Sequence, residues 1–175
     1  MLEENKSYLD LAARKDIYDS IKKSPGLHFR ELQRRTKLAT GSIDYHLHFL
    51  HRHGLIRTEK TSRFVRYYPA DQAFDEKEKE LLNLLRQEKI RHILIHIIQN
   101  KRPNALKIAN DLAISPSSLS WYLKKLAEKN IILQKKVGRF RYYSVYDKKK
   151  IILCLIAYKT SFVDDVVDSF IKAWE

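Results

Sequence analysis

The sequence has 175 residues, of which 34 are lysine or arginine and 21 are aspartate or glutamate, so its formal net charge at pH 7 is +13. This excess favours a polyanionic partner such as nucleic acid, with a lysine-rich surface that binds nothing as the alternative. The single cysteine, Cys154, excludes an intramolecular disulfide and fits a buried packing role in a reducing compartment. Neither an apolar run of about 18 residues, as a membrane span needs, nor the apolar core of a signal peptide is present, so we expect a soluble, cytoplasmic protein with no membrane partner.

Two helices are expected first along the chain. Apolar residues at helical spacing predict a helix from about residue 8 to residue 23, with Leu11 and Ile17 on its inner face. The Ser-Pro-Gly sequence at residues 24–26 ends this helix, because proline and glycine both break the pattern. A second helix is predicted over residues 28–36.

Residues 40–68 contain the motif from which we infer the fold. Three apolar side chains spaced by about one helical turn, Ile43, Leu47 and Leu50, give one buried face and leave the opposite face free until Gly54 ends the helix. Two β-rich segments on either side of a short basic turn follow, which predicts a hairpin. A helix with a free face followed by a basic hairpin is typical of a winged helix–turn–helix domain.

The same pattern occurs twice, with an offset of 76 residues. Residues 42–47 align without a gap on residues 118–123, and the Arg-Tyr-Tyr sequence at 66–68 aligns on 141–143 after the loss of one residue. We therefore predict a mainly α fold with small β-wings (α+β). Its parts are a first winged helix–turn–helix domain over residues 1–72, a second over residues 73–146, and a C-terminal helical packing or dimerisation segment over residues 147–175.

The second copy is expected to begin with one long helix over residues 76–100, whose first half connects the two domains. Asn104 should cap the next helix, with Leu106 among its buried residues. Ser115 should cap the second recognition helix, and Pro116 occupies its first turn, where a missing N–H costs nothing.

Residues 147–175 have no counterpart in the first copy. They predict two helices, the second of them capped at Ser161 and carrying acidic residues such as Asp164 on its solvent side. Its apolar stripe needs a partner, which is either the second domain of the same chain or a second copy of the chain. We expect the second copy, and so a homodimer formed through Phe162, Val163, Val166, Val167, Phe170, Ile171 and Trp174.

The free faces of the two recognition helices are the expected DNA contacts, because an α-helix fits the major groove of duplex DNA. Residues 118–143 carry seven bases and one acid, which concentrates positive charge on the second recognition helix and its wing. Hydroxyls near a helix start suit phosphates, and wing arginines suit phosphates or the minor groove. The expected contacts are Thr40, Ser42, Asp44, Tyr45, His48, Arg63 and Arg66 in the first domain, and Ser115, Ser117, Ser118, Ser120, Trp121, Lys124, Lys125, Arg139 and Arg141 in the second.

The two recognition helices differ in one informative position. Asp44 stands where the second helix has Ser120, and a carboxylate near phosphates is repulsive unless it accepts a hydrogen bond from a cytosine amino group. We therefore expect the second domain to supply more of the affinity, and the first to supply specificity or a protein contact. Trp121 has a second interpretation as a core residue, and the amphipathic Tyr45 at the matching position does not decide between them.

The segments GSIDYHLHFLHRHGLI and SPSSLSWYLKKLAEKNII, each followed by an aromatic wing, resemble archaeal winged-helix transcription regulators of the ArsR/MarR-like type. The tandem arrangement and the tail SFVDDVVDSFIKAWE resemble archaeal regulators with two winged helices. The resemblance implies a transcriptional regulator, often dimeric, with Asp44 as a departure from the small residue usual there. We expect it to bind double-stranded DNA sequence-specifically. The resemblance also implies DNA contact at Ser42, Tyr45, His48, Ser118, Trp121 and Lys124.

Metal sensing, catalysis and protein binding are the alternatives. His92 and His96 lie one turn apart as metal ligands can, but no cysteine or carboxylate set completes a tetrahedral site, so no cofactor is expected. A glycine-rich phosphate loop, a Ser-His-Asp arrangement and paired carboxylates are all missing, so we do not expect an enzyme. The second hypothesis is a protein–protein adaptor in the transcription or replication machinery, and RNA binding is the third. A non-specific DNA coater also stays open.

Overall fold

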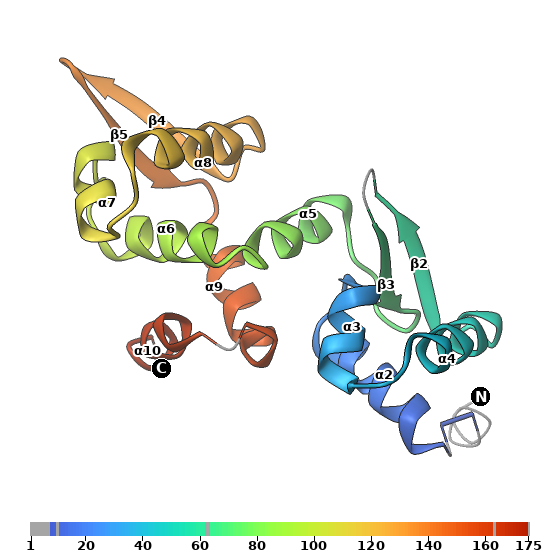
Figure 1. Cartoon of the computed structure of the whole chain (residues 1–175). Helices are drawn as coiled ribbons and strands as arrows, with labels where there is room; N and C mark the ends of the chain where they lie inside the picture. Colours follow the sequence, from blue (N-terminus) through green and yellow to red (C-terminus); the bar gives the residue numbers. More distant parts are fainter. Residues whose placement is uncertain (1–7, 10, 62–63, 163, 175) are drawn as a thin grey trace. The chain divides into compact units, whose positions relative to one another are not determined.

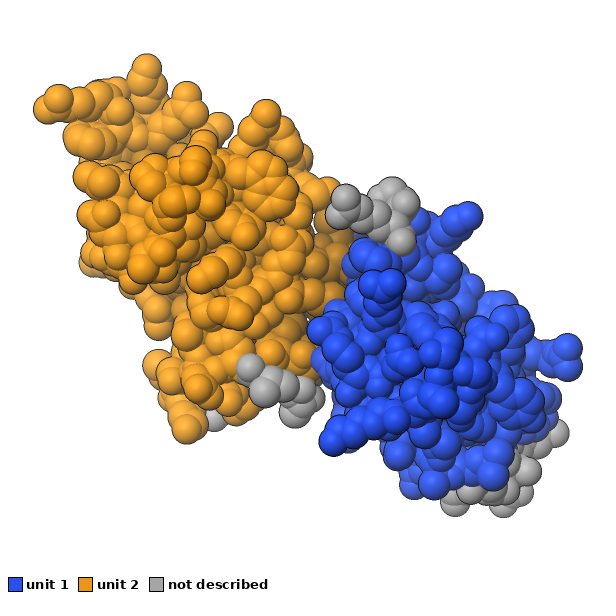
Figure 2. All heavy atoms as spheres, in the orientation of Figure 1, with its two compact units in different colours: residues 1–79 blue, residues 80–175 orange. Residues whose placement is uncertain are grey.

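The computed structural model describes residues 8–9, 11–61, 64–162 and 164–174. The chain divides into two compact units, residues 1–79 and residues 80–175 (Figures 1 and 2). Helix α5 (Glu76–Leu85) spans the boundary. Unit 1 contains α2 (Ala12–Lys23), β1 (Leu27–His28), α3 (Phe29–Thr36), α4 (Thr40–Arg52), β2 (Ile56–Lys60) and β3 (Val65–Pro69). Unit 2 contains α6 (Glu88–Gln99), α7 (Ala105–Asp111), α8 (Pro116–Glu128), β4 (Ile132–Val137), β5 (Phe140–Val145), α9 (Lys148–Ala157), the 3₁₀ turn η1 (Lys159–Ser161) and α10 (Asp165–Lys172).

Unit 1 is built around the inner face of α4. Ile43, Leu47 and Leu50 share one buried core with Ile17 and Ile21 of α2. The three strands pair antiparallel in the order β1-β3-β2, and the β2–β3 hairpin is the wing. The predicted layout of a helix followed by a hairpin is confirmed.

Unit 2 repeats this arrangement. Leu119, Leu123 and Leu126 of α8 lie in the same core as Ile93 and Ile97 of α6. Strands β4 and β5 form a two-stranded antiparallel wing (Figure 1). An isolated bridge between Asn104 and Tyr142 stands where unit 1 has its third strand. The predicted fold class, two helix–turn–helix units with small wings and C-terminal helices, is therefore confirmed.

The turns of the two units repeat as closely as their helices do. Residues with positive φ recur at the offset of 76, although left-handed backbone costs an ordinary residue about 1–2 kcal/mol. The same three turns therefore hold the same backbone geometry in both copies, whether or not glycine is present. The matched residues, with their φ angles, are Gly26 (82°) and Arg102 (53°), Lys37 (55°) and Ala113 (49°), and Gly54 (68°) and Asn130 (53°).

The single long helix predicted over residues 76–100 is wrong, because the chain breaks between α5 and α6. Gln87 adopts an extended conformation as the N-cap of α6. The buried guanidinium of Arg91 donates hydrogen bonds to the carbonyls of Leu85 at 2.9 Å and Arg86 at 3.1 Å. These carbonyls at the end of α5 are thus satisfied by a side chain of α6 instead of by continuing helix.

Three local expectations are also corrected. The first helix begins at Ala12, and Leu11 is its N-cap and 52% exposed. The second begins one residue late, because His28 lies on β1 and caps α3: the Glu31 N–H donates to His28 Nδ1, and the His28 N–H donates to the Glu31 carboxylate. Leu106, expected inside, is 61% exposed. Cys154 is buried, as expected.

The predicted dimer seam is wrong for most of α10, which packs within unit 2. Val167, Phe170 and Ile171 are each 1% exposed and belong to the core of unit 2, and Phe162 packs against that core. These side chains have found the partner that the stripe needed inside the same chain. Of the remaining predicted residues, Val166 and Trp174 are exposed, and Val163 lies outside the described residues.

Asp164 links α10 to α6 through hydrogen bonds. The solvent-facing position predicted for this residue is therefore wrong. Its carboxylate accepts hydrogen bonds from Arg91 at 2.6 and 2.8 Å, and both side chains are 5% exposed. His92 Nε2 lies 3.1 Å from the same carboxylate. Asp164 also caps α10 by accepting from the Val166 N–H, so the predicted cap at Ser161 is wrong.

Burial alone would raise the pKa of Asp164, but the hydrogen bonds and charges of Arg91 and His92 together hold that pKa below its ordinary value. The stabilisation that this carboxylate gives is therefore present above the ordinary carboxyl pKa of about 3.9 and is lost as pH falls through the lower folded value.

Asp164→Asn tests this ion pair while keeping the helix cap, because asparagine caps helices as well as aspartate does. Arg91 is then buried without a counter-ion, which should lower the free energy of unfolding by about 3–5 kcal/mol. Both tryptophans, Trp121 and Trp174, lie in unit 2, so urea unfolding followed by tryptophan fluorescence measures the change. The variant should also lose less stability than the parent chain between pH 5 and pH 3, a window set by the ordinary carboxyl pKa of about 3.9.

The matched control is Asp165→Asn, which removes the same charge from the exposed neighbouring residue. It should follow the parent chain at both pH values. An equal destabilisation in the two variants would contradict the special role of Asp164.

Candidate nucleic-acid interface

The outer face of α8 is exposed and carries hydroxyl, aromatic and cationic side chains. Ser115 caps the helix by accepting from the Ser118 N–H at 3.3 Å, and Pro116 is its first residue, as predicted. The Ser115 hydroxyl also donates to the Ser118 hydroxyl at 2.9 Å. Among the predicted contacts on this helix, the exposed residues are Ser117, Ser118, Ser120, Trp121 and Lys124.

Trp121 is 56% exposed, so the core interpretation of this residue is wrong. Tyr45, its counterpart in unit 1, is 61% exposed. Each unit therefore presents one large aromatic side chain at the same position of its recognition helix. Both rings are therefore accessible to a ligand.

The outer face of α4 differs in charge from that of α8. Asp44 and His48 are exposed and lie 3.9 Å apart across one helical turn, where an ion pair contributes little. Thr40 is exposed and its hydroxyl accepts from Gln33 at 3.0 Å, while Ser42 is half-buried. The helix is capped by Ala39 without a side-chain hydrogen bond, so its start lacks the serine cluster of α8.

Two predicted cations are already engaged within their own units. Arg66 donates to the carbonyl of Gly26 at 2.7 Å and is half-buried, so its guanidinium helps to hold the turn after α2. Lys125 is half-buried, donates to Gln87 Oε1 at 3.3 Å and lies 4.9 Å from the Trp121 ring centroid. Burial and then the charge of Lys129 lower the pKa of Lys125. Arg66 and Lys125 therefore both make contacts within their own unit in this structure.

The wing of unit 2 carries several cations that, among the described residues, have no hydrogen-bond or ion-pair partner. Arg139 and Arg141 are exposed on either side of Phe140, with the Arg139 guanidinium 5.6 Å from that ring. Lys135 and Lys136 on β4 are exposed too, and sequence reasoning omitted them from the contacts although the basic run 135–141 contains them. Arg63, the corresponding arginine of the first wing, lies outside the described residues.

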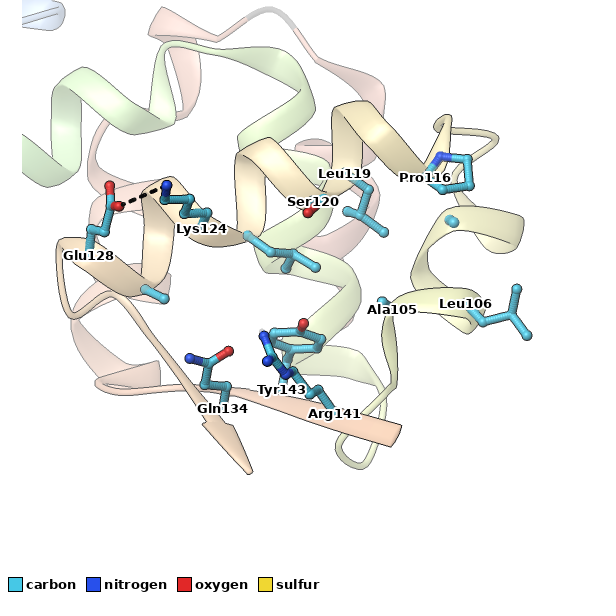
Figure 3. A pocket seen from close by; sticks show the side chains of 13 residues that line it. Ala105, Leu106, Pro116, Leu119, Ser120, Lys124, Glu128, Gln134, Arg141 and Tyr143 are labelled. Atoms are coloured by element: carbon cyan, nitrogen blue, oxygen red, sulfur yellow. Dashed lines mark ion pairs between the residues drawn. The ribbon is translucent and has the colours of Figure 1, made fainter. Parts of the chain in front are cut away.

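A hollow beside α8 is the feature that sequence reasoning missed altogether. It lies between α7, α8 and the wing, and its volume is about 680 Å³ (Figure 3). Lys124 and Arg141 belong to both its wall and the predicted DNA contacts. The only signal in the sequence is the small size of Ala105 and Ala109 in the second copy.

The histidine pair expected as a weak metal candidate is divided between two carboxylates. His92 contacts Asp164, and His96 Nε2 lies 2.7 Å from Asp111 Oδ2. In the part of the chain that the structure describes, no three histidine, cysteine or acidic side chains come together as a metal site would require. Nor, within those residues, is any helix both long and apolar enough to cross a membrane.

Comparison with known families places this architecture in a class. Residues 11–82 match a family described as an N-terminal HTH domain, and residues 86–132 match winged helix-turn-helix DNA-binding domains. The chain is therefore a tandem helix–turn–helix protein, as the resemblance seen in its sequence implied.

The chain is similar to an uncharacterized HTH-type transcriptional regulator of the archaeon Methanocaldococcus jannaschii, with 34% identity over 145 residues. The match covers 82% of this chain but 36% of that protein, so the chain spans about a third of the relative's length. Among solved structures, HlyU from Vibrio cholerae aligns with a TM-score of 0.43 and 19% identity over 48% of this chain and 90% of that one. A likeness at that TM-score adds nothing to the assignment.

His46 gives a prediction about the pH dependence of unit 1. It is 7% exposed, and its buried Nδ1 atom has no hydrogen-bond partner among the residues that the structure describes. Burial, and then the charge of Arg14, lower its pKa. The folded chain therefore resists protonation at His46, and stability falls as pH drops below the ordinary histidine pKa of about 6.5.

His46→Tyr introduces the residue found at the matching position 122 of the second copy. It should reduce the loss of unfolding free energy between pH 7 and pH 5, a window chosen around the ordinary histidine pKa of about 6.5, as measured by chemical denaturation followed by circular dichroism. His48→Tyr, on an exposed histidine of the same helix, is the control and should keep the pH dependence of the parent chain. The same flattening in both variants would show that the buried ring is not the cause.

Proposed function

We propose that this chain is a sequence-specific transcriptional regulator that binds double-stranded DNA through α4 and α8 in the major groove and through its basic wings. The observation that carries the proposal is the set of exposed side chains on the outer face of α8 and on the wing of unit 2, namely Ser118, Trp121, Lys124, Arg139 and Arg141. These side chains combine phosphate-binding cations with groups that hydrogen-bond or stack on base edges.

Unit 2 is the stronger DNA-binding unit in this proposal. Its recognition helix starts with a serine cluster at its N-terminus, where the serine hydroxyls and the positive end of the helix dipole both suit a phosphate. Lys124 pairs with Glu128 only at 3.9 Å and with both side chains exposed, so exchanging this contact for a phosphate costs little. The wing adds cations that have no competing acid on the same hairpin.

Unit 1 contributes more to sequence specificity than to affinity for DNA in this proposal. Its exposed recognition residues, Asp44, Tyr45 and His48, bring a carboxylate where unit 2 has a hydroxyl. A carboxylate in the major groove is tolerated where it accepts a hydrogen bond from the amino group of cytosine, and is repelled elsewhere by the phosphates. Asp44 would then act chiefly by rejecting wrong sequences.

Replacing Arg139 and Arg141 together by alanine tests the proposal. Each lost phosphate contact should reduce the salt dependence by about 0.9 in the slope of log K against log salt, so the double variant should lose a slope of about 1.8 together with affinity. Fluorescence anisotropy on duplex DNA over a salt series measures both quantities.

The control is the double variant Lys149→Ala and Lys172→Ala, which removes the same charge from exposed positions on α9 and α10. It should leave the slope nearly unchanged. If the two double variants behave alike, binding follows net charge and the wing has no special role.

Selection from a random duplex pool then separates a regulator, which enriches a recurrent site, from a non-specific coater, which enriches none. An adaptor would keep its protein partner after loss of both arginines.

The homodimer stays a prediction, and the apolar surface available for it is smaller than the seven-residue stripe expected from the sequence. With most of α10 packed inside unit 2, the exposed large apolar side chains in the described part of the C-terminal segment are Leu153, Ile156, Val166 and Trp174. Sedimentation equilibrium of the full chain measures the oligomeric state directly.

A further inference from the structure

The hollow in unit 2 has an apolar floor and a polar rim. Leu119 of α8 lines it on the helical side, and Tyr143 of β5 lies opposite (Figure 3). Leu123 of α8 and Ala109 of α7 also line it. Its volume of about 680 Å³ falls within the range of about 300–1,000 Å³ that is usual for small-molecule sites. All of its lining residues belong to one unit, so the hollow is complete in a single chain.

The first copy has larger side chains at the matching positions. Phe29 stands where the second copy has Ala105, and it packs against the core of unit 1. Gln33 stands where the second copy has Ala109, and its side chain donates to Thr40 at 3.0 Å, which joins α3 to the start of α4. At these two positions of α3, the first copy therefore carries larger side chains than α7 of the second.

The rim of the hollow is suited to an anion. Arg141 is exposed, and among the described residues its guanidinium has no hydrogen-bond or ion-pair partner. In the first copy the matching residue, Arg66, donates a hydrogen bond to the carbonyl of Gly26. Lys124 adds a second cation, which the exposed Glu128 neutralises only in part at 3.9 Å, and Ser120 and Gln134 supply further hydrogen-bonding groups.

We propose that this hollow binds a small amphipathic carboxylate, whose apolar body lies on Leu119, Leu123 and Ala109 and whose carboxylate pairs with Arg141. An apolar floor beside an unpartnered guanidinium fits this class better than an inorganic anion, which would leave the floor empty, or an uncharged lipid, which would leave Arg141 unpaired.

Occupancy of the hollow should oppose DNA binding, because Arg141, Lys124 and Ser120 serve both ligands. This coupling rests on the proposed function, whereas binding of the carboxylate itself does not. Competition for shared side chains lowers each ligand's affinity by the same factor.

Calorimetric titration of the full chain with decanoate, without DNA, tests the site. One equivalent should bind, while decanol and inorganic phosphate, which each carry half of the required chemistry, should bind at least about tenfold more weakly, as expected for the loss of one charge-assisted hydrogen bond. Equal affinity for decanol would overturn the role of Arg141, and equal affinity for phosphate would overturn the role of the apolar floor. No binding of any of the three would overturn the proposal.

Ala105→Phe places in the hollow the side chain that the first copy carries at the same position. Ala109→Gln likewise introduces the matching residue of the first copy, with a smaller added side chain. Both should abolish decanoate binding while the thermal midpoint shows that unit 2 stays folded. Decanoate binding that survives in two folded variants would place the ligand elsewhere and overturn the assignment.

The coupling is measured separately, by titrating decanoate into the complex of the chain with duplex DNA. Decanoate should displace the DNA from the parent chain and not from Ala105→Phe. If decanoate binds the free chain but leaves the complex intact, the site stands and the proposed competition fails. If the chain binds no DNA at any salt concentration, the proposed function fails while the calorimetric result is unaffected.

Discussion

Both units depend on the burial of one face of a recognition helix. Three apolar side chains from each of α4 and α8, spaced by about one turn, share a core with two isoleucines of the preceding α2 or α6. Each such side chain contributes roughly 1.5–3 kcal/mol when fully buried. Because a helix has only one such face inside, its opposite face must remain in solvent, and the position of the core residues decides which side chains a ligand can reach.

This dependence explains why the architecture could be predicted from the sequence. Helical periodicity, turn residues and the offset of 76 are local or internally repeated signals, and they located the two recognition helices, both wings and the exposed position of Tyr45. The break between α5 and α6 and the position of α10 could not be predicted in this way. At the break, Arg91 donates to the carbonyls at the end of α5, and α10 is held by the pairing of Arg91 with Asp164, 73 residues later in the chain. Neither contact produces a periodic pattern in the sequence.

At the candidate interface, too, features set by local sequence patterns could be predicted, and features set by contacts between distant residues could not. Exposure followed from the helical pattern for most predicted contacts. Arg66 was assigned to DNA because basic residues in a wing usually face solvent, but it donates to Gly26, 40 residues earlier in the chain. The hollow beside α8 was missed for a different reason: it results from side chains that are small, and a small residue in an amphipathic helix looks like any other helix former until the opposing surface is known.

The unlike outer faces of α4 and α8 have a consequence for the geometry of recognition. Two identical heads related by a two-fold axis bind a palindromic site, and such a site has no direction. A single chain with two different heads on one covalent tether binds the second half-site as an intramolecular event, and it requires those halves in a fixed order. If both heads contact DNA as proposed, each bound chain has a direction along the duplex, and a homodimer with a two-fold axis would require two such sites in opposite directions.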